Sequence, residues 1–133
     1  MAKLTPYLMS VNARQQAEFY IEALGGEILN VMTHDQMPGA GPDASDKVLH
    51  MTIVAGGVTF FLCDGILTPQ PGSHTFLSLE FTDDADARSA FDRLSQDGQI
   101  YHPLEQAFWG TLFGQLTDRF GVNWMITTEQ QTR

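Results

Sequence analysis

The chain is poor in cysteine and in basic residues. Its 133 residues include one cysteine, and seven lysines and arginines stand against sixteen aspartates and glutamates. A single cysteine leaves no internal disulfide and is typical of a reducing compartment, so we expect a cytoplasmic protein. The formal net charge of -9, with no basic cluster, argues against a nucleic-acid partner and against binding to an anionic membrane, because both need a positive patch.

Long apolar runs are also missing. No stretch reaches the roughly 20 apolar residues of a transmembrane helix. Residues 1–6 lead directly toward a short apolar strand and do not resemble a signal peptide. We therefore expect a soluble protein folded as one compact domain over residues 1–133, a length sufficient for a substantial core.

The pattern of apolar residues predicts two helices among several strands. Asn12 is a candidate N-cap for a helix over residues 13–24. Asp83 or Asp84 caps a second predicted helix, which ends at Leu94. We expect strands at residues 4–11, 27–33, 47–54, 58–63, 76–81, 99–101, 109–116 and 122–127.

The two halves of the chain repeat one pattern. Two pairs of blocks match in spacing: residues 13–28 with 85–100, and residues 56–62 with 120–126. Each half predicts the order strand, helix, strand, strand, strand, the first over residues 4–64 and the second over residues 73–128. One such half leaves a face of its sheet bare, so two halves facing each other would enclose a cavity.

The most regular stretch lies near the C-terminus. Its centre, residues 117–121, predicts a tight turn in which Asp118 accepts hydrogen bonds and Gly121 takes a positive φ. The predicted strands on either side carry both tryptophans, Trp109 and Trp124. An aromatic β-hairpin is therefore expected to complete the domain.

Several short blocks carry a resemblance to a known superfamily. They are TPYL at 5–8, NAR at 12–14, EFY at 18–20, GGE at 25–27, MPG at 37–39, VLH at 48–50, FWG at 108–110 and TDRFGVNWM at 117–125. The chain resembles the vicinal oxygen chelate superfamily, which includes glyoxalase I, extradiol dioxygenases, and the fosfomycin and bleomycin resistance proteins. Within it, the chain is similar to the PhnB-like branch, also labelled demethylubiquinone methyltransferase-like. A methyltransferase activity gains no support, because no glycine-rich cofactor loop follows the first strand.

The resemblance implies an α+β fold of two βαβββ modules whose sheets form a partly open, barrel-like cavity, and usually a homodimer. Active superfamily members bind a divalent metal through His, Glu or similar ligands on the first and last strands of the modules. The corresponding positions here are Thr5 to Tyr7, Phe61 or Leu62, Phe76 or Leu77, and Met125. None is His, Glu or Asp, so we expect no metal and no other cofactor at the standard site.

Two side chains are candidates for catalysis. His50 lies on an inner strand, where it would act as a general base, a hydrogen-bond donor or a shifted metal ligand; the alternative is a half-buried histidine bonded to the backbone. Glu80 shares a strand face with Phe76 and becomes a candidate acid or base if that face lines the cavity; otherwise it is a solvated strand residue. Cys63 has no basic neighbour in sequence, so a nucleophilic role is not expected.

A cavity between sheets would be lined by aromatic and apolar side chains. The candidate ligand contacts are Tyr7, His50, Phe61, Phe76, Trp109, Phe113, Trp124 and Met125. The sequence thus favours a protein that binds a small molecule without the standard metal. The alternative is a metal-dependent lyase, isomerase, transferase or dioxygenase of the glyoxalase type, with ligands recruited from His50, His74 and Glu80. A third reading is an interaction module with a filled cavity, and residues 35–46 are a candidate lid.

Overall fold

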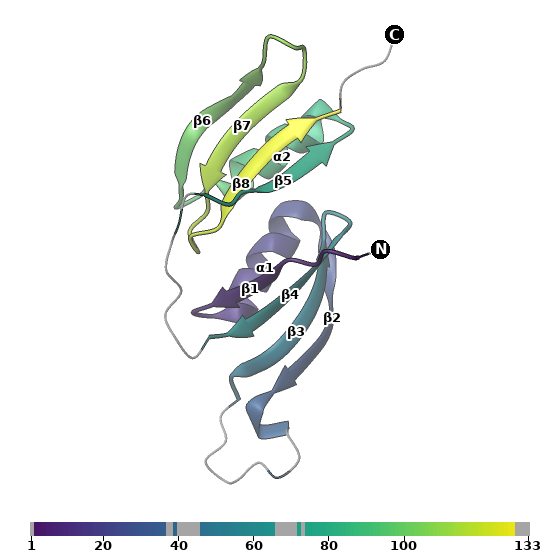
Figure 1. Ribbon diagram of the computed structural model, residues 1–133, viewed down its shortest axis with the longest axis vertical. Helices are drawn as coiled ribbons and strands as arrows, with labels where there is room; N and C mark the ends of the chain where they lie inside the picture. Colours follow the sequence, from purple (N-terminus) through teal and green to yellow (C-terminus); the bar gives the residue numbers. More distant parts are fainter. Residues whose placement is uncertain (1, 37–38, 40–45, 66–71, 73, 130–133) are drawn as a thin grey trace. The chain divides into compact units, whose positions relative to one another are not determined.

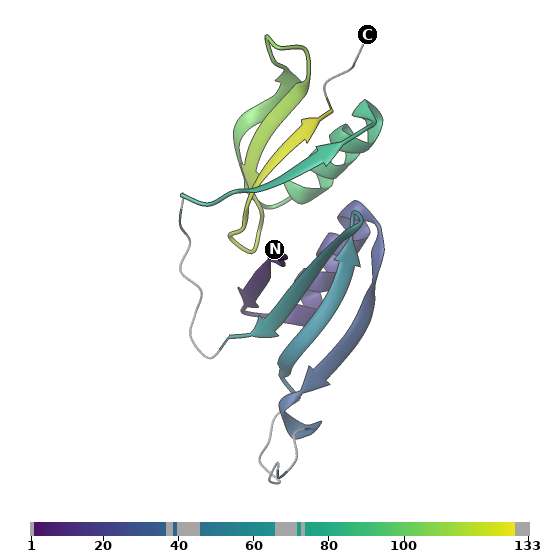
Figure 2. The same ribbon diagram turned by 45° about the vertical axis from the view of Figure 1, so that its right-hand side comes forward.

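The computed structural model describes residues 2–36, 39, 46–65, 72 and 74–129. The chain divides into two compact units, residues 1–69 and 70–133 (Figures 1 and 2). Each unit is one βαβββ module with a four-stranded mixed sheet. The predicted α+β class and the repeated βαβββ pattern are confirmed.

The first module follows the predicted order. Its elements are β1 (Tyr7–Ser10), α1 (Ala13–Leu24), β2 (Gly26–Thr33), the 3-10 turn η1 (His34–Gln36), β3 (Val48–Ala55) and β4 (Val58–Asp64). The sheet order is β1-β4-β3-β2, with β1 parallel to β4 and the other pairs antiparallel. Helix α1 packs on one face of this sheet, where Tyr20 meets Phe60 within the core (Figure 1).

Helix α1 begins and ends where its sequence predicts. The side chain of Asn12 accepts a hydrogen bond from Gln15 N at 3.2 Å, which satisfies one of the free amides of the first turn. Gly25 ends the helix with a φ of 79°, and its amide donates to Ile21 O at 2.8 Å. The helix is therefore specified locally, before any tertiary contact is considered.

The second module repeats the architecture of the first. Its elements are β5 (Leu77–Phe81), α2 (Asp84–Leu94), β6 (Gln99–Gln106), β7 (Leu112–Thr117) and β8 (Asn123–Thr128). The sheet order is β5-β8-β7-β6, so the four strands of the second module, counted along the chain, take the same places as those of the first. Asp83 is the N-cap of α2. The buried face of this helix consists of Ala87, Ala90, Phe91 and Leu94, as its periodicity predicts.

The hairpin turn near the C-terminus has the expected chemistry. Gly121 has a φ of 90°, and Asp118 is buried. One carboxylate oxygen of Asp118 accepts from Phe120 N at 2.8 Å and Val122 N at 3.1 Å. The other accepts from Trp124 Nε1 at 2.8 Å. Asp118 therefore fixes both the turn and the indole that follows it.

Three predicted strand boundaries shift by more than one residue. Strand β1 begins at Tyr7, and β6 continues to Gln106 through Pro103, whose missing N–H is tolerated on an edge strand. The strand expected from Trp109 begins only at Leu112. Residues 107–111 form a turn instead, because Ala107 N donates to Thr111 O at 2.8 Å and Gly110 N to Ala107 O at 2.9 Å.

The candidate lid is only partly described. Within residues 35–46, Asp35 and Gln36 belong to η1, and residues 37–38 and 40–45 lie outside the described residues. No helix in the described part of the chain is long and apolar enough to cross a membrane.

Candidate functional site

The face of the first sheet opposite α1 carries an aromatic cluster. The register pairs Tyr7 with Phe61 and Phe61 with Thr52, and His50 lies two residues before Thr52 on the same face. The ring centroids are 6.0 Å apart for Tyr7 and Phe61, 4.9 Å for His50 and Phe61, and 5.7 Å for Tyr7 and His50. The structure thus brings together three of the predicted ligand contacts. His50 is half-buried, and its Nε2 lies 3.4 Å from the hydroxyl of Thr52.

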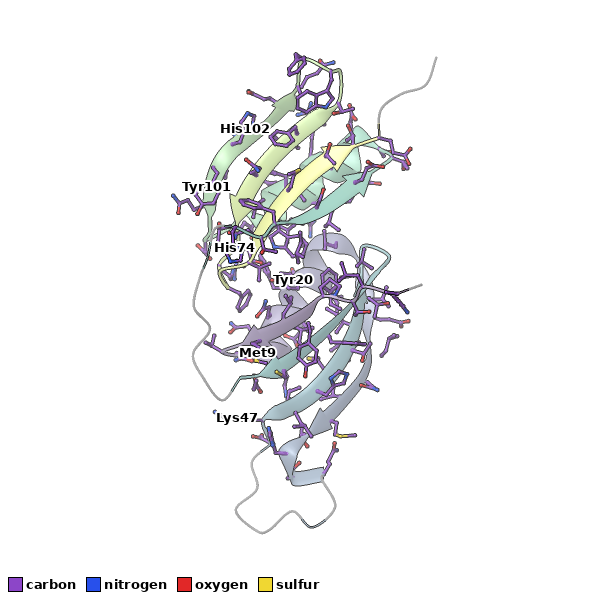
Figure 3. All side chains as sticks on the ribbon, viewed as in Figure 1. Met9, Tyr20, Lys47, His74, Tyr101 and His102 are labelled. Atoms are coloured by element: carbon purple, nitrogen blue, oxygen red, sulfur yellow. The ribbon has the colours of Figure 1, made fainter. Side chains whose placement is uncertain are left out.

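A pocket of about 340 Å³ adjoins this cluster. It is lined by Tyr7, Met9, His34, Leu49, Cys63, Asp64 and Gly65. Two of its lining residues carry sulfur: the buried Cys63 thiol donates to Met9 Sδ at 4.0 Å, since Met9 and Cys63 are register partners on β1 and β4 (Met9 is labelled in Figure 3). We call this the sulfur pocket.

Two polar groups of the sulfur pocket, those of Asp64 and Tyr7, differ in whether they can bind a ligand. Asp64 is committed to the fold, because its two carboxylate oxygens accept from Ala13 N at 2.7 Å and Val48 N at 2.8 Å. Tyr7 remains 48% exposed. Burial raises the pKa of Tyr7, and the hydrogen bond with Cys63 and the charge that Cys63 gains on ionising raise this pKa further. Tyr7 is therefore a protonated hydrogen-bonding group at neutral pH.

Sequence reasoning missed most of this pocket. Met9 and Leu49 were not predicted as ligand contacts, and Cys63 was considered only as a nucleophile. The sequence contains one indication of the pocket. Strict alternation places Tyr7 and Met9 on the same face of one strand, and Phe61 and Cys63 on the same face of another. The missing step was the parallel pairing of β1 with β4, which joins residues 54 positions apart.

The open face of the second sheet holds a different set of side chains. His102 and Trp109 both contact Phe113, with centroids 5.2 Å and 5.9 Å apart. The register places Glu80 beside Thr127 on this face, and its side chain is exposed. Phe76 is half-buried just before β5, and Met125 is half-buried on β8.

Trp124 lies on the other face of the second sheet. It is 0% exposed, and its register partners are Leu77 and Leu116, on the side covered by α2. Its indole N–H is taken by Asp118. Trp124 thus belongs to the core of the module and does not share a surface with Trp109.

The metal ligands that the resemblance implies do not fit the residues at those positions. Tyr7 and Phe61 are cross-strand neighbours in the first module, and the second module has Phe76 or Leu77 and Met125 at the corresponding positions. These side chains offer a phenol, apolar groups and a thioether where imidazole and carboxylate would hold a hard or borderline divalent ion.

The alternative metal ligands predicted from the sequence are His50, His74 and Glu80. Among the described residues, no three His, Cys, Asp or Glu side chains form a group that could hold a metal ion. His50 belongs to the first module, whereas His74 and Glu80 belong to the second. His74 is exposed, and its Nδ1 lies 2.8 Å from Thr75 Oγ1 (Figure 3).

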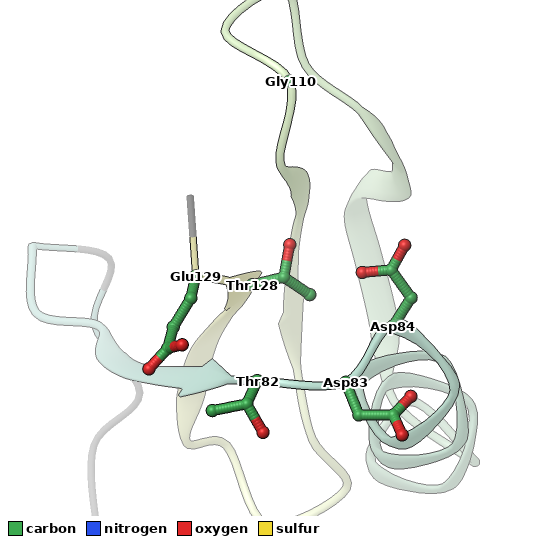
Figure 4. A pocket seen from close by; sticks show the side chains of 6 residues that line it. All are labelled: Thr82, Asp83, Asp84, Gly110, Thr128 and Glu129. Atoms are coloured by element: carbon green, nitrogen blue, oxygen red, sulfur yellow. The ribbon is translucent and has the colours of Figure 1, made fainter. Parts of the chain in front are cut away.

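A second pocket, of about 510 Å³, lies in the second module (Figure 4). It is lined by Thr82, Asp83, Asp84, Gly110, Thr128 and Glu129. Two of its polar groups serve the fold: Asp83 accepts from Ala85 N at 2.7 Å as the helix cap, and Thr128 Oγ1 accepts from Leu112 N at 3.0 Å. The sulfur pocket is the better candidate because Met9, Leu49 and Cys63 give it an apolar wall, which small-molecule sites usually have.

The comparisons with known proteins agree with this architecture. The family model of the Glyoxalase/Bleomycin resistance protein/Dioxygenase superfamily matches residues 8–126. The chain belongs to this superfamily. It is 26% identical to Protein YjdN of Escherichia coli K12 over 141 aligned residues, covering 96% of each chain.

Two solved structures extend the likeness within the superfamily. Protein PA1353 from Pseudomonas aeruginosa is 29% identical, with a TM-score of 0.83 over 98% of this chain and 100% of that one. A protein from Bacillus cereus, described as a putative 3-demethylubiquinone-9 3-methyltransferase and PhnB protein, is 26% identical, with a TM-score of 0.79 over 96% of this chain and 100% of that one. The resemblance to PhnB-like proteins is confirmed.

Proposed function

We propose that this superfamily member is a small-molecule binding protein that does not use the standard metal site. The sulfur pocket carries the proposal. Its volume of about 340 Å³ lies within the usual range of ligand pockets, and it combines an apolar wall with a few polar groups. This is the composition that small organic ligands need.

The lining residues indicate how a ligand would be held. Met9 and Cys63 offer polarisable sulfur, which makes favourable contacts with aromatic rings. Leu49 adds an apolar surface, and the protonated Tyr7 hydroxyl can donate to a carbonyl or ether oxygen of the ligand in place of its hydrogen bond with Cys63. The ligand class that fits best is therefore a flat or apolar molecule with one hydrogen-bond acceptor.

The test is a titration of the labelled protein with indole and with 2-naphthol, followed by amide chemical shifts. Binding is expected to shift the amide signals of Met9, Cys63 and Gly65. Met9→Ala should weaken binding at least fivefold, because it removes one wall of the pocket. Met32→Ala is the matched control, since Met32 is also an exposed methionine of the same sheet and does not line the pocket.

Two results would contradict the proposal. One is the absence of localised shifts at millimolar probe. The other is an equal loss of affinity in Met9→Ala and Met32→Ala, which would indicate non-specific contact with the sheet.

We also propose that the protein is a homodimer, as the resemblance implies. Light scattering should then give twice the chain mass of 14.8 kDa. A monomer at working concentration would reject this part of the proposal and leave the binding site untouched.

A further inference from the structure

The turn between β6 and β7 presents two large aromatic side chains to solvent. Phe108 is 97% exposed and Trp109 is 46% exposed. A side chain that stays exposed does not contribute the free energy of apolar burial, which is roughly 2–3 kcal/mol for a phenylalanine. Such exposure is unusual enough to need a reason.

The turn fixes the backbone that carries these rings and the orientation of the Trp109 indole. Two backbone hydrogen bonds close it, from Ala107 N to Thr111 O at 2.8 Å and from Gly110 N to Ala107 O at 2.9 Å. Trp109 Nε1 also donates to Thr111 Oγ1 at 2.6 Å. The indole is thus oriented before any ligand arrives, which lowers the entropic cost of binding.

The planes of three aromatic rings meet at steep angles. The Phe108 and Trp109 centroids are 4.8 Å apart with an interplanar angle of 82°, and those of Trp109 and Phe113 are 5.9 Å apart with an angle of 73°. We call these three residues the aromatic corner. Because the face of an aromatic ring is electronegative, a corner of this kind attracts a cation that approaches the exposed faces.

Within the described part of the second module, a carboxylate and no lysine or arginine lies on the open face beside the aromatic corner. Glu105 is the register partner of Phe113, and its exposed carboxylate lies 3.8 Å from His102 Nε2. The lysines and arginines among the described residues of the second module are Arg88 and Arg93 on α2 and Arg119 in the β7–β8 turn. None of these three lies on the open face of the sheet, and Arg119 pairs with Asp97 at 3.4 Å. The surroundings of the aromatic corner are complementary to a positive ligand.

We propose that the aromatic corner and Glu105 form a binding site for small organic cations that carry an alkylated ammonium group. The ammonium group lies against the exposed faces of Phe108 and Trp109, and the carboxylate of Glu105 balances its charge. The site is separate from the sulfur pocket, because none of its residues lines that pocket.

The probes are choline and 3,3-dimethylbutan-1-ol, which have the same shape and differ in charge. The measurement follows the two indole N–H signals at pH 8, above the ordinary titration range of histidine. Choline is expected to shift the Trp109 signal and to leave Trp124 unchanged, because Trp124 is buried and bonded to Asp118. The neutral probe is expected to bind at least tenfold more weakly.

Variants separate the contributions of rings and charge. In the Trp109 variants, which lack this indole reporter, choline binding is read from the backbone amide signals of Gly110 and Thr111. Trp109→Ala should abolish choline binding, whereas Trp109→Phe should retain it, and an unchanged Trp124 signal shows that each variant is folded. Glu105→Gln should weaken choline binding three- to tenfold. Asp92→Asn is the control, since Asp92 is an exposed carboxylate of α2 in the same module, and it should have no effect.

Three outcomes would overturn the proposal. Equal binding of the neutral probe would show that shape and apolar contact suffice. A Trp109 signal that moves with protein concentration alone would show that a second copy of the chain occupies the corner. No shift at 100 mM choline would show that the corner has no affinity for ammonium groups.

Discussion

The phenol of Tyr7 lies against Cys63, and three effects keep its proton in place. Burial contributes most, followed by the hydrogen bond with Cys63 and the charge of the ionised thiol. The pKa of Tyr7 is therefore raised above the ordinary tyrosine value of about 10. At neutral pH this hydroxyl is a hydrogen-bond donor, which is the role that the proposed function gives it.

Tyr7 is expected to ionise above pH 10. The difference in 295 nm absorbance between the wild-type protein and Tyr7→Phe isolates its titration. Cys63→Ala should lower the pKa of Tyr7 part of the way, because burial remains. Since the folded state holds the proton more tightly than the unfolded state, the contribution of Tyr7 to stability is intact below about pH 10 and is lost as pH rises through the folded pKa. A titration at or below the ordinary value would contradict this prediction.

Asp118 is expected to contribute to the stability of the second module through its hydrogen bonds. Asp118→Asn keeps one acceptor oxygen but turns an N–H donor toward either the turn amides or the indole of Trp124. Because buried donors then face each other and the charge is lost, we expect a loss of about 2–3 kcal/mol in the free energy of unfolding. Urea unfolding measures it. Asp92→Asn, an exposed aspartate of α2, should change stability by less than about 0.5 kcal/mol.

The residues that sequence reasoning placed correctly are those whose roles are local. Asp118 and Gly121 were predicted because turn chemistry depends on a few neighbouring residues. The position of Trp124 was not predicted. Alternation indicates which residues share a face of a strand, but it does not say which face a helix will cover. Trp124 and Met125 were both predicted to line the cavity, although consecutive strand residues point to opposite faces, and only Met125 lies on the open face.

At the scale of elements, each module has a glycine at the start of its second strand where backbones approach too closely for a side chain. A Cβ on Gly26 would lie 1.8 Å from Val54 O, and a Cβ on Gly98 would lie 2.2 Å from Thr117 O. Both glycines stand where the second strand of a module begins, at equivalent positions of the sequence repeat. The matching glycines thus have a structural cause, which is the same strand pairing in both modules.

Substitution of either glycine should therefore destabilise its module. Gly26→Ala and Gly98→Ala force an atom into backbone, so each should cost at least about 2–3 kcal/mol. Gly72→Ala is the control, because its added Cβ meets nothing within 4 Å and its φ is not positive. Thermal unfolding followed by circular dichroism checks the three variants. An unchanged melting temperature in Gly26→Ala or Gly98→Ala would show that the strands can separate at no cost.

The boundaries that were missed belong to irregular segments. The predicted end of β6 at residue 101 rested on Pro103, yet the strand continues because it is an edge strand whose outer amides have no partner in the sheet. The strand expected at Trp109 gave way to a turn because Gly110, with a φ of 99°, allows a conformation that propensity alone does not reveal.

At the scale of the whole molecule, one architecture occurs twice with different side chains on its two open faces. The first module presents Tyr7, His50, Phe61 and the sulfur pocket, and the second presents His102, Glu105, Phe113 and the aromatic corner. The repeat itself could be read from the sequence because it rests on local periodicity. The sulfur pocket could not, because it depends on pairing between segments far apart in the chain.

The side chains at the family's metal-ligand positions determine how the protein should respond to divalent metals. The positions that correspond to the family's metal ligands hold Tyr7 and Phe61 in one module and Phe76 or Leu77 with Met125 in the other, a poor donor set for zinc, nickel or manganese. A metal that binds the folded state and is present at 100 times its Kd would stabilise that state by about 2.7 kcal/mol. For a chain of this size that is a rise of at least about 5 °C in Tm. We expect these ions to raise the Tm by less than about 1 °C.

A double variant provides the positive control. Tyr7→His with Phe61→Glu places an imidazole and a carboxylate on neighbouring strands, since the two positions are register partners. Zinc should raise the Tm of this variant and not that of the wild-type protein. Stoichiometric metal that survives dialysis of the wild-type protein, with a Tm rise that is lost in His50→Ala, would instead establish a shifted metal site and favour the glyoxalase-type alternative.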